Sequence, residues 1–203
     1  MKHWLSSPLF LLCALLCLAG CQEKHAYSSL KSSYKVEGAR RFGVALFQNL
    51  TPNRQAGQDV SGYCYNELFR LVYEGQLAPV GLPFEVLDEN LMSEAMTQVK
   101  WEDQINNTAS LRQLAKASEC HMVLMGTVSE YHYKRGLGED PVVSLHLRMY
   151  DAESDTVMWS GSYSKTGRFS WFREDALGRL GQEVSRELLG KLKEALLQRF
   201  LHE

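Results

Sequence analysis

The sequence predicts a single α/β domain, built as a sandwich of a mixed β-sheet and packed helices. In the first half, short apolar runs alternate with segments of helical spacing, which is the pattern of strands joined by helices. The second half adds three strand patterns in close succession and one long helical stripe. The 203 residues, 45% apolar and 23% charged, suit one ordinary globular domain.

Two short strands and a helix are expected first. The uninterrupted apolar run 41–47 is typical of a strand that is covered on both faces, and residues 84–89 form a second short strand. A helix should begin near Gln58, because apolar residues follow it at helical spacing. They are Val60, Cys64, Leu68 and Leu71 or Val72.

Two helices and three strands come next. One helix runs from residue 89 or 90 to about 99, and the other spans 110–118, with Asn107 or Thr108 as its cap. Three strands then follow closely, at 121–133, 142–150 and 156–164, with a hairpin loop at 151–155.

The alternation in the middle strand assigns its two faces. Val143, Leu145, Leu147 and Met149 share one side, and Ser144, His146, Arg148 and Tyr150 share the other. A helix from about 173 to 200 closes the chain, with Leu177, Leu180, Val184, Leu188, Leu192, Leu196 and Phe200 as its apolar stripe. The expected order is β-α-β-α-α-β-β-β-α, with about five strands in the sheet.

The N-terminus has the features of a lipoprotein signal peptide, expected over residues 1–20. Its charge-free apolar run 9–19 is too short to span a membrane of about 30 Å but suits a signal sequence. The end, Leu18-Ala19-Gly20-Cys21, resembles the bacterial lipobox, in which the cysteine receives diacylglycerol. Gln22 at the next position points to the outer membrane by analogy with enteric sorting. The alternative is a plain signal peptide in which Cys21 is incidental.

Cleavage before Cys21 divides the remaining chain in two. Residues 21–40 lack periodicity and are expected to be an acylated tether, and residues 41–203 form the periplasmic α/β domain. The mature chain keeps 21 basic and 24 acidic side chains, a net charge of −3 in place of −2. Neither value shows the basic excess of a nucleic-acid binder, so no nucleic-acid partner is expected.

Cys64 and Cys120 are the thiols that remain after processing. They could form a disulfide in the oxidising periplasm, but the pattern favours two buried, unpaired side chains. Cys120 is adjacent to His121, and neighbours on a strand point to opposite faces, so a nucleophile–base pair is not expected there. Histidines at metal-ligand spacing are missing from the sequence. We therefore expect no enzyme activity, no metal and no cofactor.

Acidic residues gather between positions 85 and 103. This window holds six acidic residues and one basic residue, Lys100, which gives a local net charge of −5. The acidic residues are Glu85, Asp88, Glu89, Glu94, Glu102 and Asp103. Glu139 and Asp140 add to the acidity further along the chain. The pattern is explained either by ordinary solvated surface or by an electronegative face that attracts a cationic partner.

Three aromatic side chains stand close together before the final helix. Phe169, Trp171 and Phe172 are flanked by Arg168 and Arg173. One or two of the rings could pack beneath the helix. Otherwise they are exposed, and an exposed Trp beside Arg is typical of a membrane-interface contact.

Three stretches of the sequence resemble a group of periplasmic lipoproteins that includes CsgG, LpoB and PelC: 42–57, 122–167 and 170–189. The general features are Asn49-x-Thr51 after a strand, Gly126-Thr127-Val128, and Asp151-x-Glu153-Ser154 followed by Trp159. More particular to PelC-like export lipoproteins are Thr51-Pro52-x-x-Gln55-Ala56-Gly57, Glu130-Tyr131-x-Tyr133-Lys134-x-Gly136, Pro141-x-Val143 and Lys165-x-Gly167.

The resemblance implies a non-enzymatic outer-membrane lipoprotein that forms a homo-oligomeric ring in the periplasm. Such a ring would guide a cationic, Pel-like exopolysaccharide to an outer-membrane porin, because the fields of identical acidic faces add at a central opening. The residues expected to guide the polymer are Asp88, Glu89, Glu102, Asp103, Glu139 and Asp140. Those expected to contact the membrane beside acylated Cys21 are Phe169, Trp171 and Phe172.

The alternative within the same group is an LpoB-like activator of a peptidoglycan synthase, or another CsgG-like secretion or assembly lipoprotein. Activators of the first kind carry a long tether that crosses the periplasm. The 19 residues at 22–40 are short for that purpose, since they reach roughly 60 Å when fully extended.

Overall fold

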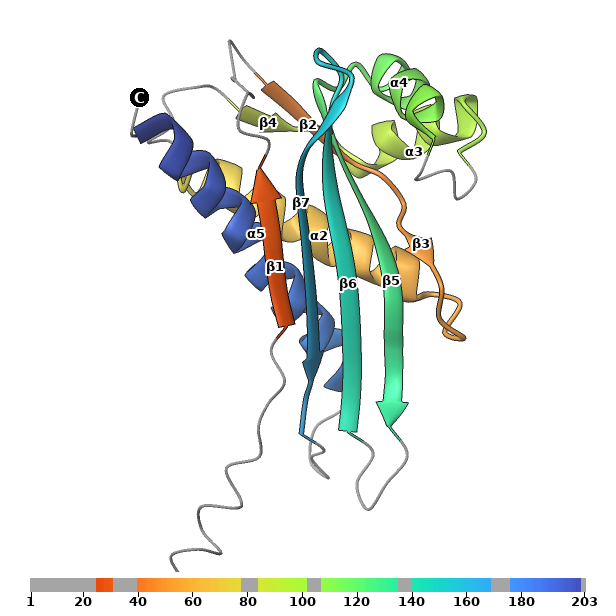
Figure 1. The fold of residues 1–203 in the computed structure, drawn as a ribbon. Coiled ribbons are helices and arrows are strands. Elements are labelled where there is room, and N and C mark those ends of the chain that lie inside the picture. Colours follow the sequence, from red (N-terminus) through yellow and green to blue (C-terminus); the bar gives the residue numbers. More distant parts are fainter. Residues whose placement is uncertain are drawn as a thin grey trace, which may run out of the picture.

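The computed structural model describes residues 25–30, 40–77, 84–101, 107–134, 140–168 and 176–201, with the backbone alone at 25–30 and 199–201. Within these ranges, seven strands form one mixed sheet (Figure 1). They are β1 (His25–Leu30), β2 (Arg40–Val44), β3 (Gln48–Asn49), β4 (Phe84–Val86), β5 (Met122–Lys134), β6 (Asp140–Asp151) and β7 (Thr156–Thr166).

The strand order is β1-β7-β6-β5-β2-β4, and the short β3 pairs with β5. Strands β5, β6 and β7 form an antiparallel meander, in which consecutive strands are separated by only a few residues of sequence. Strand β2 is parallel to both β4 and β5, since a helical crossover returns the chain in the same direction. The mixed α/β fold expected from the sequence is therefore confirmed.

The helices are α2 (Ala56–Tyr73), α3 (Glu89–Gln98), α4 (Thr108–Ala117) and α5 (Ala176–Leu201). Helices α2 and α5 lie behind the sheet as Figure 1 is drawn, whereas α3 and α4 lie at its upper end on the other side. The predicted order of strands and helices is the observed one, with β1 and β3 added. Asn107 caps α4, and its side chain accepts a hydrogen bond from the Ala109 amide.

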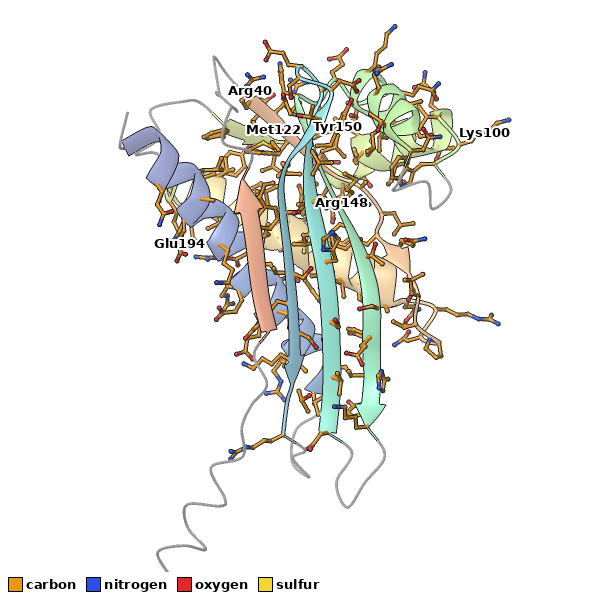
Figure 2. All side chains as sticks on the ribbon, in the orientation of Figure 1. Arg40, Lys100, Met122, Arg148, Tyr150 and Glu194 are labelled. Atoms are coloured by element: carbon orange, nitrogen blue, oxygen red, sulfur yellow. The ribbon has the colours of Figure 1, made fainter. Side chains whose placement is uncertain are left out.

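Two apolar cores follow from this arrangement. The larger lies between the sheet and helices α2 and α5, and the smaller between the sheet and helices α3 and α4. Val143, Leu145, Leu147 and Met149 of β6 belong to the larger core, as their alternation predicts. Tyr150 faces the other way into the smaller core, while Arg148 lies further down the same strand (Figure 2).

The apolar stripe of α5 is buried as expected. Five of its members belong to the larger core: Leu180, Val184, Leu188, Leu192 and Leu196. Leu177 is partly buried against them. The side chain of Phe200, and position 173 where the helix was expected to begin, lie outside the described residues.

Strand β1 is not anticipated by the sequence, which places residues 21–40 in a tether. It pairs antiparallel with β7, from His25 opposite Ser164 to Leu30 opposite Trp159. This edge strand has one partner, and its small polar residues give little alternation, so its pattern is hard to distinguish from that of a linker. The sheet consequently begins four residues after Cys21.

The two cysteines of the domain are unpaired. Cys64 lies on α2 in the larger core, and Cys120 lies just before β5 in the smaller core. The sheet separates them, so the favoured expectation of two buried thiols is confirmed. Burial raises the pKa of the Cys64 thiol to about 12. Both thiols are therefore protonated and act as small apolar groups.

Two glycines of α2 have opposite surroundings. A Cβ atom added at Gly57 would lie 2.6 Å from the Phe47 carbonyl oxygen, so glycine allows the start of α2 to approach the chain between β2 and β3. A Cβ added at Gly62 would meet nothing within 4 Å. The first glycine is a packing requirement, whereas the second only lowers helix propensity.

We predict opposite effects of alanine at these two positions. Gly57→Ala should lower the free energy of unfolding by about 1–3 kcal/mol through overpacking, whereas Gly62→Ala should raise it by up to about 1 kcal/mol. Urea unfolding followed by circular dichroism measures both. Equal changes in the two variants would contradict the packing described here.

A charged cluster ties α4 to the hairpin between β6 and β7. Asp155 accepts hydrogen bonds from the Arg112 guanidinium and, at 2.6 Å, from the Tyr150 hydroxyl. Arg112 and then Tyr150 lower the pKa of the Asp155 carboxyl. A carboxyl whose pKa is lower in the folded state stabilises the fold above its ordinary pKa, and this contribution is lost as the pH falls.

Asp155→Asn should therefore destabilise the protein at pH 7, and the difference from wild type should shrink as the pH falls below about 3.9. Asparagine tolerates the left-handed backbone at this position, where φ is 53°. Glu94→Gln, at an exposed position on α3, is the control and should have no such pH-dependent effect. Thermal unfolding between pH 2.5 and 7 measures this; a pH-independent loss would show that the charge is not the cause.

Candidate functional site

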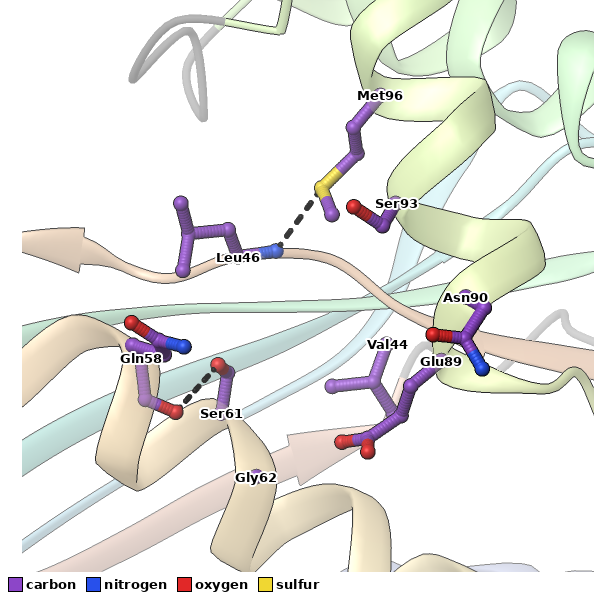
Figure 3. A pocket seen from close by; sticks show the side chains of 9 residues that line it. All are labelled: Val44, Leu46, Gln58, Ser61, Gly62, Glu89, Asn90, Ser93 and Met96. Atoms are coloured by element: carbon purple, nitrogen blue, oxygen red, sulfur yellow. Dashed lines mark hydrogen bonds between the residues drawn. The ribbon is translucent and has the colours of Figure 1, made fainter.

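A pocket of about 440 Å³ lies between helices α2 and α3 (Figure 3). Its floor is the chain that leads from β2 to β3, with Val44 and Leu46. The two helices supply the walls, which include five polar side chains: Gln58, Ser61, Glu89, Asn90 and Ser93, together with Gly62 and Met96. The Leu46 amide donates to the Met96 sulfur at 3.2 Å, which holds the floor against α3.

The start of α3 supplies the charge of this site. Asp88 caps the helix, and its side chain accepts a hydrogen bond from the Asn90 amide at 2.8 Å. Glu89 is the first residue of the helix, and its carboxyl extends from α3 toward α2 (Figure 3). Burial, followed by the neighbouring Asp88 carboxylate, raises the pKa of Glu89.

The two carboxylates have no cationic neighbour in the part of the chain that the structure describes, where the ion pairs use other acidic residues. Glu85, close in sequence, differs in this respect because it pairs with Arg41. Tyr65 of α2 experiences the same negative potential: burial, then Asp88 and Glu89, raise the pKa of its hydroxyl. The described residues therefore give the pocket a negative potential.

Three aromatic side chains extend the same face of α2 beyond the pocket. Tyr65, Phe69 and Tyr73 follow Gly62 at intervals of three, four and four residues, so they lie in one row. The ring centroids of Tyr65 and Phe69 are 6.2 Å apart, and those of Phe69 and Tyr73 are 4.3 Å apart. Phe69 is 45% and Tyr73 55% exposed. We refer to these three residues as the aromatic face.

The sequence analysis does not identify the aromatic face, although its signal is present. The three rings recur every four residues, as the apolar stripe of the same helix does, but on a different side. An aromatic row displaced from the core stripe indicates an exposed surface. The pocket itself gives no such signal, because its walls come from segments about 30 residues apart.

Of the predicted acidic residues that the structure describes, Asp140 lies far from Asp88 and Glu89. In the register of the sheet, Phe42 lies beside both Val86 and Met122, the first residue of β5. Asp140 lies opposite Lys134, the last residue of β5. At ~3.3 Å per residue, about 30 Å of strand separates Asp140 from the pair Asp88 and Glu89. Within the window 85–103, Glu85 forms an ion pair with Arg41, so its charge does not add to that of Asp88 and Glu89.

Other predicted site residues lie outside the described residues. They are Glu102, Asp103 and Glu139 of the acidic set, Phe169, Trp171 and Phe172 of the aromatic set, and Cys21. In the described ranges, no helix is long and apolar enough to cross a membrane, and no group of His, Cys, Asp and Glu could hold a metal ion.

One serine–histidine pair lies elsewhere on the sheet. The His146 Nδ1 and Ser162 Oγ atoms are 2.6 Å apart, and the two residues are directly opposite each other on β6 and β7. Burial, then Arg148, lowers the pKa of His146. Because these are ordinary cross-strand neighbours and neither lines the pocket, the contact is explained by pairing within the sheet.

No protein-family model matches this chain. A search of the curated proteins also finds no matching sequence.

Solved structures, in contrast, share its fold. The PelC dodecamer from Paraburkholderia phytofirmans matches with a TM-score of 0.52 and 19% identity, covering 84% of this chain and 97% of that one. Lipoprotein GNA1162 from Neisseria meningitidis matches with a TM-score of 0.50 and 19% identity, covering 76% of this chain and 99% of that one. LpoB from E. coli is more distant, with a TM-score of 0.44 and 16% identity over 64% of this chain and 59% of that one. The chain therefore has the fold of PelC and the Neisseria lipoprotein, within the group that its sequence motifs resemble.

Proposed function

We propose that this chain is a non-enzymatic outer-membrane lipoprotein whose domain assembles into a periplasmic ring. The ring guides a cationic, Pel-like exopolysaccharide toward an outer-membrane porin. The main support is the fold shared with the PelC dodecamer over 97% of that chain. The lipobox-like end of the signal sequence supplies the anchor at Cys21.

The uncompensated carboxylates support the choice of a cationic polymer. Asp88 and Glu89 contribute two negative charges at the pocket, and a ring repeats them at every subunit. Repeated charges around an opening focus the field and raise the local concentration of a cationic chain. The attraction at each subunit is weak and is screened over about 8–10 Å, which suits a polymer that must both enter and leave.

The register of β1 supports a definite orientation on the membrane. His25 lies opposite Ser164, so Cys21 attaches at the end of the sheet from which β7 leads toward Phe169. Four residues reach at most about 14 Å, which keeps this end of the domain close to the bilayer. Phe169, Trp171 and Phe172 are then well placed in the chain to make the second membrane contact.

In this orientation the pocket faces away from the membrane. Asp88 and Glu89 would meet the polymer on the periplasmic side, and Asp140 would lie near the membrane end. The short link between Cys21 and β1 also disfavours an activator that must reach across the periplasm, because pairing with β7 removes six residues from the tether.

The anchor is tested by replacing two cysteines of the precursor. Cys21→Ser should abolish acylation and release the protein from the outer-membrane fraction, because Cys21 is the cysteine at the end of the lipobox-like sequence. Cys17→Ser, four positions earlier in the signal sequence, should leave both unchanged. Radiolabelled palmitate incorporation and membrane fractionation measure this. Membrane retention of the Cys21→Ser variant would refute the lipid anchor.

The ring is tested by native mass spectrometry of the acylated mature protein in detergent. We expect one closed multiple of the subunit mass, and binding of the assembly to polycationic chitosan that weakens steeply between 50 and 300 mM salt, as about 8–10 Å screening implies. A persistent monomer at high concentration, or binding that does not depend on salt, would count against the proposed function.

A further inference from the structure

The pocket and the aromatic face are parts of one surface along α2. Gln58 and Gly62 line the pocket, and Tyr65, Phe69 and Tyr73 continue from them at helical spacing. The Tyr73 hydroxyl accepts a hydrogen bond from the Val86 amide at 3.5 Å, which fixes the far end of the row against β4.

Exposed aromatic rings in mutual contact are typical of a binding surface. A large apolar ring left in water loses the stabilisation of burial, and contiguous exposed apolar surface marks an interaction site more often than chance. Phe69 is exposed to solvent, although its ring lies between the rings of Tyr65 and Tyr73. Phe69 and Tyr73 thus present exposed apolar rings, whereas Tyr65 is partly buried against the larger core.

The polar walls of the pocket narrow the chemistry of the partner. Hydroxyl and amide groups from Gln58, Ser61 and Ser93 can exchange hydrogen bonds with a hydroxyl-rich ligand. The carboxyl groups of Asp88 and Glu89 add a demand for positive charge. Aromatic rings also attract cations through their faces, so both parts of the surface favour a ligand that carries ammonium groups.

A sugar chain with free amino groups meets all of these requirements. Its rings have apolar faces that stack on aromatic side chains, their hydroxyl groups match the pocket walls, and their ammonium groups complement the carboxylates. A neutral sugar lacks the charge, and a simple polyamine lacks the stacking faces. The class of polymer rests on the proposed function. The surface adds the place on each subunit where the polymer is held.

We propose that the α2–α3 pocket and the aromatic face together bind several consecutive units of an amino-sugar chain. One unit sits in the pocket beside Glu89, and the following units stack along Tyr65, Phe69 and Tyr73. Guidance is then local recognition by stacking and charge at each subunit, in addition to the long-range field of the ring.

The test uses the acylated mature protein in detergent and two defined probes. These are a fully deacetylated glucosamine hexamer and its neutral N-acetylated counterpart. Isothermal titration calorimetry should detect the first and show at least about tenfold weaker binding of the second, because only the first can pair with the carboxylates.

Variants with matched controls locate the site. Phe69→Ser and Glu89→Gln should each weaken binding of the cationic hexamer about five- to tenfold. Tyr133→Ser, an exposed ring on β5, and Glu94→Gln, an exposed carboxyl on α3, should change it less than about twofold. Gly62→Leu should block the pocket without harming the fold, since a Cβ there meets nothing within 4 Å.

Three results would overturn this inference. Equal loss in the test and control variants would mean that only overall charge matters. Disassembly of the oligomer by Phe69→Ser would show that the aromatic face contacts a second copy of this chain. An anchored ring that attracts long chitosan but binds neither hexamer would refute the local site and leave the proposed function standing, whereas a monomer without an acyl anchor would refute that function.

Discussion

The apolar face of the β5–β6–β7 meander is the constraint on which the rest of the structure depends. It runs the full length of the three strands and includes Leu124, Leu145 and Trp159. Side chains of this size each contribute about 1.5–3 kcal/mol on burial, so the face requires continuous cover. Helices α2 and α5 provide it, and their lengths of 18 and 26 residues match this task.

The opposite face of the sheet carries its apolar cluster near one end. There Val123, Met125 and Tyr150 are covered by α3 and α4, whereas the next alternate positions along β6 are Arg148, His146 and Ser144. The domain is therefore polarised along its strands. One end carries the small helices, the capped start of α3 and the pocket, and the other carries His25, where β1 begins opposite the end of β7 (Figure 1). The proposed function assigns the first of these ends to the polymer and the second to the membrane.

The periodicity of the sequence predicted most helices and strands of this fold well. It predicted less well which residues lie close together in space. The alternation in β6 and the stripe of α5 are regular over many residues, so both the elements and their buried faces were predictable. Strand β1 was missed because a polar edge strand lacks alternation, and β3 because two residues are too few for a pattern. The distance of Asp140 from the start of α3 and the ion pair of Glu85 were not predictable, since the length of β5 and the position of Arg41 matter only in three dimensions.

In the proposed ring, identical subunits direct their carboxylates toward a common opening above the membrane. Electron cryomicroscopy of the acylated mature protein in detergent would show this arrangement. We expect a closed ring in which Asp88, Glu89 and the aromatic face of every subunit line the opening, with the His25 end of each sheet toward the detergent. A ring with these residues on its outer rim or against the detergent, or no closed ring, would contradict it.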